Sequence, residues 1–302
     1  MKINSKFFKK LFFFTLISFI SIECSIRIFK LTNDIPQREI DENGLQTYVV
    51  NQTGYFNNNL WKVNEYGFIG LKDVNHDNQI LIIGDSMIEN IMNPIECNLG
   101  YYIKNQMKEK YGVFEIGRSG MTLIEAMEFK KKYETIIKPK KIIVFINEND
   151  VEESISEISR LSDRLQISIK SGDLEKVKIK YPVLKKILYN IKTIYYLYIK
   201  GYFSVNFLKF QTNKKVMETN YEKLEKFFTI LKLNYDLEKV TFLINSNDPN
   251  IELIESALKK NKLIKFKTLE NWFVKGDGHW NCLGHKNVSN LIVERLNNIY
   301  AN

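Results

Sequence analysis

The pattern of apolar and polar positions separates a short apolar N-terminal segment from a long alternation of strand-like and helix-like runs. An uncharged run at residues 11–22 follows four lysines, Lys2, Lys6, Lys9 and Lys10. This run is shorter than the ~20 residues that span a bilayer, but it lengthens when residues 7–8 and 24–29 are counted with it. A basic flank before an apolar run predicts that the N-terminus stays inside and that the remainder lies outside.

Residues 1–30 fit an uncleaved signal anchor or a cleaved signal peptide. No small-residue cleavage site follows Ile22, so we favour a transmembrane anchor. The phenylalanine clusters at 7–8 and 12–14, and the lack of a polar face, argue against a buried helix of a cytoplasmic protein. We therefore expect a bacterial-type protein tethered to a membrane, with its remaining residues in the periplasm or at the cell surface.

Beyond a polar and irregular stretch at 31–75, short β-branched runs alternate with helical periodicity. The predicted strands are 79–83, 113–116, 141–146, 240–244 and 263–267, and the predicted helices are 98–111, 123–137, 251–258 and 283–300. Strands that are almost continuously apolar and alternate with helices predict a parallel sheet covered on both faces. The fold class is therefore α/β.

Residues 151–235 interrupt this alternation with a Lys-rich segment that we expect to be helical. We interpret it as a helical cap inserted into a single domain that spans residues 31–302. Its amphipathic stretch at 184–210 fits either a cap helix over the active site or a helix lying on an anionic membrane, and we favour the cap.

Charge and cysteine content exclude several classes of protein. The net charge of +9 comes mostly from lysines spread along all 302 residues, without the compact Arg-rich patch of a nucleic-acid-binding protein. The three cysteines are Cys24, Cys97 and Cys282, and none forms a C-x-x-C pair, so a zinc site is not expected. The sequence leaves open whether Cys97 and Cys282 form a disulfide.

Four loops with chemically useful residues follow four of the predicted strands. They contain Gly84-Asp85-Ser86, Gly117-Arg118-Ser119-Gly120, Asn147-Glu148-Asn149-Asp150 and Asp277-Gly278-His279. Ligands of open parallel sheets bind beyond the carboxyl ends of the strands, so these loops are expected to meet. Together they supply the residue types that acyl transfer needs.

The expected catalytic residues are Ser86 as nucleophile, His279 as its base and Asp277 as the acid that orients the base. A serine hydroxyl becomes a good nucleophile only when a base takes its proton, and an Asp fixes the tautomer of that base. Gly120 and Asn149 are the expected oxyanion-hole donors, with the Ser86 amide as a third. This scheme needs no metal and no organic cofactor.

The order of these loops resembles the four conserved blocks of the SGNH (GDSL-like) hydrolase and acyltransferase superfamily. Asn64-Glu65-Tyr66-Gly67-Phe68 and Trp280-Asn281 with Gly284-His285 resemble segments of its membrane-anchored branch. The resemblance covers about residues 60–150 and 236–300. It implies a flavodoxin-like three-layer fold and activity on esters, often O-acyl groups of carbohydrates or lipids.

The sequence departs from this family at two positions. Asn147 stands where the third block usually has glycine, and Asp277-Gly278-His279 is one residue shorter than the common Asp-x-x-His. The shorter spacing is similar to that of polysaccharide O-acetyltransferases within the superfamily. It leaves open whether Asp277 orients His279.

Simpler structural interpretations exist for several of these residues. Asp85 fits a turn or helix cap, which we favour, and Gly120 and Asn149 fit a turn glycine and a helix cap as alternatives. We interpret Arg118 as a surface arginine and His285 as structural, and we assign no role to His76 or Trp280.

We expect an acyl-ester hydrolase that acts on an acylated glycan, lipid or small molecule outside the cytoplasm. One alternative is an O-acetyltransferase of a cell-surface polysaccharide with the same triad. Another is a catalytically silent glycan-binding protein, which we rank last because no triad residue is missing.

Overall fold

A computed structural model of the 302-residue chain describes residues 5–74, 77–108, 110–147, 149–204 and 221–299. Its centre is a five-stranded sheet, with strands β5 (Gln79–Gly84), β6 (Gly112–Gly117), β7 (Lys141–Ile146), β10 (Val240–Asn245) and β11 (Lys262–Phe266). All neighbouring pairs are parallel, in the order β11-β10-β7-β5-β6. Counted along the chain, this is the 2-1-3-4-5 order of flavodoxin-like folds. The predicted α/β fold class is confirmed.

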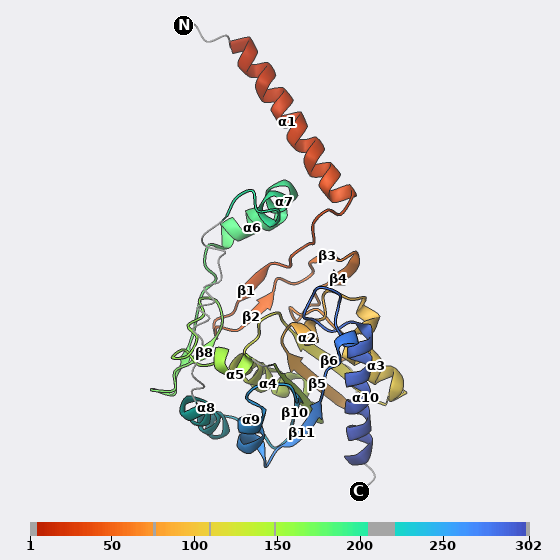
Figure 1. The fold of residues 1–302 in the computed structure, drawn as a ribbon, viewed down its shortest axis with the longest axis vertical. Helices are drawn as coiled ribbons and strands as arrows, with labels where there is room; N and C mark the ends of the chain where they lie inside the picture. The colour runs from red at the N-terminus through yellow and green to blue at the C-terminus, as the bar shows by residue number, and fades with distance from the viewer. Residues whose placement is uncertain (1–4, 75–76, 109, 148, 205–220, 300–302) are drawn as a thin grey trace.

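The sheet is covered on both faces because side chains along each strand alternate between two apolar cores. Leu81 and Ile83 lie in one core and Ile80 and Ile82 in the other. The first core is closed by α4 (Leu123–Ile137), α8 (Tyr221–Asn234) and α9 (Ile251–Leu258). The second is closed by α3 (Leu99–Gln106) and α10 (Cys282–Ile299) (Figure 1).

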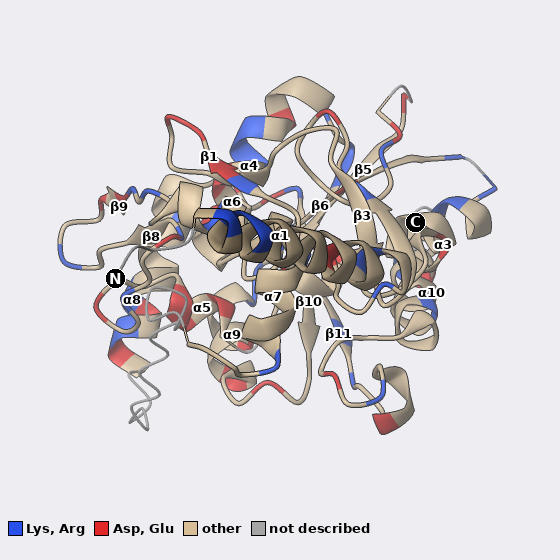
Figure 2. Cartoon of the chain, turned by 90° about the horizontal axis from the view of Figure 1, so that it is seen from above, with Lys and Arg blue, Asp and Glu red and all other residues tan. Residues whose placement is uncertain are grey.

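Helix α1 (Ser5–Ile28) projects away from this core, beyond the strand ends where α2 (Ser86–Glu89) begins (Figure 1). It is the described helix that is long and apolar enough to cross a membrane. At 1.5 Å per residue, its 24 residues extend about 36 Å. Charged residues colour only its two ends (Figure 2).

Residues 31–75, expected to be irregular, contain two antiparallel hairpins. The first pairs β1 (Arg38–Ile40) with β2 (Gln46–Tyr48), and the second pairs β3 (Thr53–Phe56) with β4 (Asn59–Lys62). The second turns at Asn57 and Asn58, whose φ angles of 48° and 64° suit a two-residue hairpin loop. Strands of three or four residues carry too little alternation to be recognised from sequence.

The segment expected to be helical at 151–235 is only partly so. Among its described residues, the helices are α5 (Asp150–Glu153), α6 (Pro182–Asn190), α7 (Lys192–Ile199) and α8. Between α5 and α6 lies a short hairpin of β8 (Gln166–Ile167) and β9 (Leu174–Glu175). Helix α8 buries Leu224, Phe227, Phe228 and Leu231 against the sheet. It therefore acts as the crossover helix between β7 and β10.

Candidate active site

Ser86 is presented at the carboxyl end of β5 by a tight strand-to-helix turn. It is the first residue of α2, and the Asp85 side chain caps this helix by accepting the Met87 amide at 2.9 Å. The close approach of α2 to the sheet requires glycine at 117, because a Cβ there would lie 2.2 Å from the Glu89 nitrogen. Asp85 thus has the capping role that we favoured from the sequence.

The structure brings His279 and Asp277 to this serine. Nε2 of His279 lies 2.8 Å from Oγ of Ser86, and Nδ1 of His279 hydrogen bonds to Oδ1 of Asp277. The same carboxylate oxygen accepts the backbone amide of His279 at 3.1 Å. One intervening residue is therefore sufficient for Asp277 to hold the ring, and the short spacing is compatible with a triad.

The loop that carries His279 is itself constrained. Val274 donates its amide to the His279 carbonyl at 2.8 Å, and Asp277 donates its amide to the Val274 carbonyl at 2.9 Å. The His279 and Asp277 side chains are 29% and 33% exposed. The pair is therefore positioned by backbone bonds while it stays open to solvent.

Two further links join the nucleophile's loop to the base's loop. Asn93, just after α2, donates its side-chain amide to the Trp280 carbonyl at 2.8 Å and also to Asn90. Cys97 forms a disulfide with Cys282, which is 185 residues further along the chain and three positions after His279. The question that the sequence left open about these cysteines thus has an answer in the structure.

The two expected oxyanion donors lie on loops that buried carboxylates hold. The Ser119 amide, next to Gly120, donates to Glu89 at 2.9 Å, and Glu89 also accepts the Tyr48 hydroxyl. Gly120 has a φ of 72°, and a Cβ there would lie 2.4 Å from Nη2 of Arg164. The positive φ favours glycine at 120, and a larger residue would also displace the Arg164 guanidinium.

The loop after β7 is bound to the loop after β5 through Asn147. The Asn147 side chain donates to Asp85 at 3.0 Å, and its backbone amide donates to Asp150 at 2.8 Å. Asn149 occupies the N-cap position of α5, where its carbonyl accepts the Glu153 amide at 2.8 Å, but its exposed side chain makes no capping hydrogen bond. Its side chain therefore remains available to a ligand.

Two buried acids in these loops have perturbed acidity. Burial raises the pKa of Asp85, although its bond from the Met87 amide opposes this shift. Burial and the neighbouring charge of Asp85 raise the pKa of Asp150 well above its ordinary value. Both shifts arise because a charged carboxylate loses its hydration inside the protein.

Other predictions had mixed outcomes. The expectation of a surface Arg118 is wrong: its side chain is fully buried, pairs with Glu125 and donates to Gln46 at 2.7 Å. His285 is buried against Trp280, as a structural role requires, and burial lowers its pKa to about 3. His76 lies outside the described residues. Within those residues, no group of three metal-ligating side chains occurs.

Sequence reasoning missed Glu89, Tyr48 and the Asn90–Asn93 pair. Glu89 lies one helical turn after Ser86, but that spacing is common, and its partners come from distant segments.

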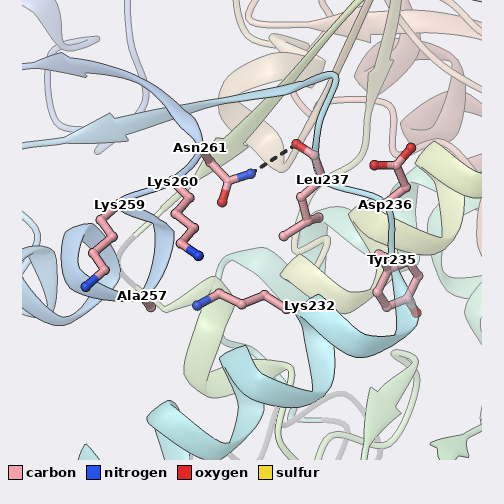
Figure 3. A pocket seen from close by; sticks show the side chains of 8 residues that line it. All are labelled: Lys232, Tyr235, Asp236, Leu237, Ala257, Lys259, Lys260 and Asn261. Atoms are coloured by element: carbon pink, nitrogen blue, oxygen red, sulfur yellow. Dashed lines mark hydrogen bonds between the residues drawn. The ribbon is translucent and has the colours of Figure 1, made fainter.

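A cavity of about 460 Å³ lies elsewhere, between the ends of α8 and α9 (Figure 3). Its lining includes Lys232, Leu237 and Asn261, which precede β10 and β11, so it opens at the edge opposite Ser86.

No protein family model matches this chain, and no characterised protein matches it in sequence. Solved structures similar to it include a lipase/acylhydrolase from Enterococcus faecalis, with 15% identity and a TM-score of 0.39 over 72% of this chain and 95% of that one. A psychrotrophic esterase from Pseudoalteromonas sp. has 11% identity and a TM-score of 0.39 over 75% and 100% of the two chains. A Clostridium thermocellum family 3 carbohydrate esterase has 13% identity and a TM-score of 0.35 over 72% of this chain and 94% of that one. At this level of similarity, function is argued from the side chains alone.

Proposed function

We propose that this protein is a membrane-tethered acyl-ester hydrolase that acts outside the cytoplasm, with Ser86, His279 and Asp277 as its catalytic triad. The observation that carries the proposal is the chain of hydrogen bonds from Asp277 through both ring nitrogens of His279 to Oγ of Ser86. This order of acid, base and hydroxyl is what nucleophilic catalysis by serine requires.

In the proposed reaction, His279 takes the Ser86 proton as Oγ attacks the ester carbonyl. Asp277 accepts a hydrogen bond from Nδ1–H of His279 and stabilises the imidazolium that forms, without taking the proton itself. The backbone amides of Ser86 and Gly120 and the Asn149 side chain stabilise the oxyanion. His279 then protonates the leaving alcohol, and water hydrolyses the acyl-enzyme by the same steps.

The proposed location rests on two independent features. The lysines before the apolar part of α1 favour a cytoplasmic N-terminus and an external C-terminal domain. The Cys97–Cys282 disulfide is typical of oxidising compartments, such as the periplasm or the cell exterior. The substrate class we propose is an O-acylated glycan or lipid.

The test is turnover of p-nitrophenyl acetate by the full chain in detergent. Ser86→Ala and His279→Ala should each lower kcat at least about 10³-fold, since members of a triad act as a unit. Ser246→Ala is the matched control, because Ser246 is an exposed serine just after the carboxyl end of β10, a strand of the same sheet. Equal turnover by Ser86→Ala and Ser246→Ala would refute the proposal.

The second candidate function is O-acetyl transfer, which the Asp277-Gly278-His279 spacing favours. It differs from hydrolysis only in the acceptor of the acyl group. Added oligosaccharide should then divert acyl product from water in the wild type but not in Ser86→Ala. A product ratio that oligosaccharide leaves unchanged would exclude the transferase.

A further inference from the structure

Helices α6 and α7 form a hairpin whose surface the proposed chemistry does not explain. Large apolar side chains project from it into solvent, and Val183 and Tyr202 are 68% and 76% exposed. The set is Val183, Leu184, Ile187, Leu197, Ile199 and Tyr202. Exposed apolar side chains gathered on two adjoining helices are what an interaction surface requires.

The hairpin is attached to the C-terminal end of α1 (Figure 1). Glu23 accepts the backbone amides of Lys192 and Thr193, at 2.9 and 2.7 Å, and so caps the start of α7. Arg27 donates to the Asn190 carbonyl at 2.6 Å. Because Glu23 directly follows the uncharged run of α1, these bonds hold the hairpin at the level where the proposed anchor leaves the bilayer.

The charges of the hairpin complement an anionic lipid surface. Lys185 and Lys186 lie on α6, and the exposed Lys200 follows α7. The Tyr189 ring on α6 contacts the Tyr195 ring on α7, which in turn stacks on Tyr198 of the same helix. Lysines and tyrosines beside an apolar face are typical of helices that lie in the interface of an anionic membrane.

The catalytic edge lies on the same side of the sheet as this hairpin. The segment that follows α1 covers the strand ends, since Tyr48 hydrogen bonds to Glu89 and Asn59 donates to the Met92 carbonyl at 2.8 Å. Figure 1 shows α1, the hairpin and the β1–β4 segment on the side where α2 begins. Helix α8 and the C-terminal end of α10 lie on the opposite side of the molecule.

We propose that the α6–α7 hairpin is a second membrane contact, which lies in the headgroup region of an anionic bilayer and turns the catalytic edge toward that surface. The inference rests on the proposed function, because it requires α1 to be the anchor. It narrows the substrate to an ester held at the bilayer surface, on a lipid or on a glycan attached to one. It replaces the sequence-based preference for a cap helix at 184–210, of which 205–210 lie outside the described residues.

The experiment places a tryptophan reporter at three sites of the full chain, reconstituted in vesicles of phosphatidylglycerol and brominated phosphatidylcholine. Ile187→Trp reports on the hairpin, Phe13→Trp reports on α1, and Leu233→Trp at the end of α8 is the matched control. All three native side chains are exposed and apolar. Emission from Trp61, Trp272 and Trp280 is subtracted with the wild-type spectrum.

Bromine quenches indole only at close range, and interfacial helices sink roughly 5–10 Å into the headgroup boundary. Phe13→Trp and Ile187→Trp should lose about half of their emission or more in brominated vesicles, whereas Leu233→Trp should lose almost none. Quenching of Ile187→Trp that weakens when phosphatidylglycerol is omitted supports the anionic surface.

Two results would overturn the inference. Quenching of Phe13→Trp with none at Ile187→Trp removes the hairpin contact but leaves the anchor and the triad intact. A blue-shifted Ile187→Trp without quenching would then assign this surface to a contact with another copy of the chain, which is the only protein in the vesicles. Absence of quenching at Phe13→Trp removes the anchor and the inference together. Turnover of p-nitrophenyl acetate is independent of these results.

Discussion

The two halves of the candidate site are held by different means. On the nucleophile and base side, a disulfide, the Asn93 side chain and backbone bonds fix Ser86 and His279. On the oxyanion side, the loops of Gly120 and Asn149 are held by the buried carboxyl groups of Glu89, Asp85 and Asp150. The first half is thus tied by a covalent bond and by amide hydrogen bonds, whereas the second depends on buried carboxyl groups, and burial raises the pKa of two of them, Asp85 and Asp150.

The largest effect should come from the base side. Asp277→Asn should lower kcat roughly 10⁴-fold, because the amide cannot stabilise the imidazolium and favours the wrong tautomer of His279. KM should change little, since this interaction strengthens only in the transition state. Steady-state turnover of p-nitrophenyl acetate measures both constants, and an unchanged kcat would remove Asp277 from the triad.

The next effect concerns folding rather than chemistry. Removal of the disulfide in the double variant Cys97→Ala, Cys282→Ala should lower the free energy of unfolding by ~2–5 kcal/mol, as loss of a native crosslink typically does. Denaturant titration of the full chain in detergent measures this loss. Cys24→Ala is the control, because that cysteine is free and exposed. Equal stability of the double variant and the control would show that the crosslink does not tie the two loops.

Asn149 tests the oxyanion side. Asn149→Ala should lower kcat about 10²–10³-fold at nearly constant KM, which is the usual cost of one oxyanion donor. Asn247→Ala is the matched control, because Asn247 is an exposed asparagine beyond the carboxyl end of β10. A loss of less than about threefold would mean that Asn149 makes no contact with the oxyanion.

The smallest effect is the pH dependence of the oxyanion side. Since the folded protein raises the pKa of Asp150, it retains a proton that the unfolded chain releases above pH ~4, and this stabilisation is lost as pH rises through the folded-state pKa. Asp150→Asn keeps an acceptor for the Asn147 amide but removes that titration. Its stability relative to wild type should therefore rise by about 1.4 kcal/mol per pH unit within that window.

Denaturant midpoints across the pH range test this prediction, with Asp236→Asn as the control because Asp236 is exposed at the opposite edge. If the difference in stability between Asp150→Asn and wild type stays constant with pH, Asp150 does not titrate in this window and the prediction is contradicted.

The sequence predicted the central fold closely because buried parallel strands are continuous apolar runs. The run expected at 79–83 is observed as Gln79–Gly84, and the helix expected at 123–137 has those bounds. The hairpins at 38–62 and 166–175 were missed, since their strands have two to four residues and little alternation. Arg118 was placed wrongly because its burial depends on Gln46, a residue 72 positions away.

The sequence predicted those residues of the candidate site that lie in loops after predicted strands. Ser86, Asp277 and His279 were named from loop order, and they lie within hydrogen-bonding distance, while their catalytic roles remain our proposal. The network of Glu89 and Tyr48 was not predictable, because no spacing in the sequence links residues 41 positions apart. The membrane contact that we propose for the α6–α7 hairpin could not be predicted, because it rests on contacts with Glu23 that no local sequence pattern indicates.

The most direct test of the triad is covalent labelling of the full chain with a fluorophosphonate, followed by peptide mass spectrometry. A phosphonate reacts with a serine that a neighbouring base has activated, and it needs no knowledge of the natural substrate. The account predicts one stoichiometric adduct on the peptide that contains Ser86, with at least about 10³-fold slower labelling in His279→Ala. Equal labelling of wild type and His279→Ala, or an adduct on another serine, would contradict the assignment of Ser86 as the nucleophile.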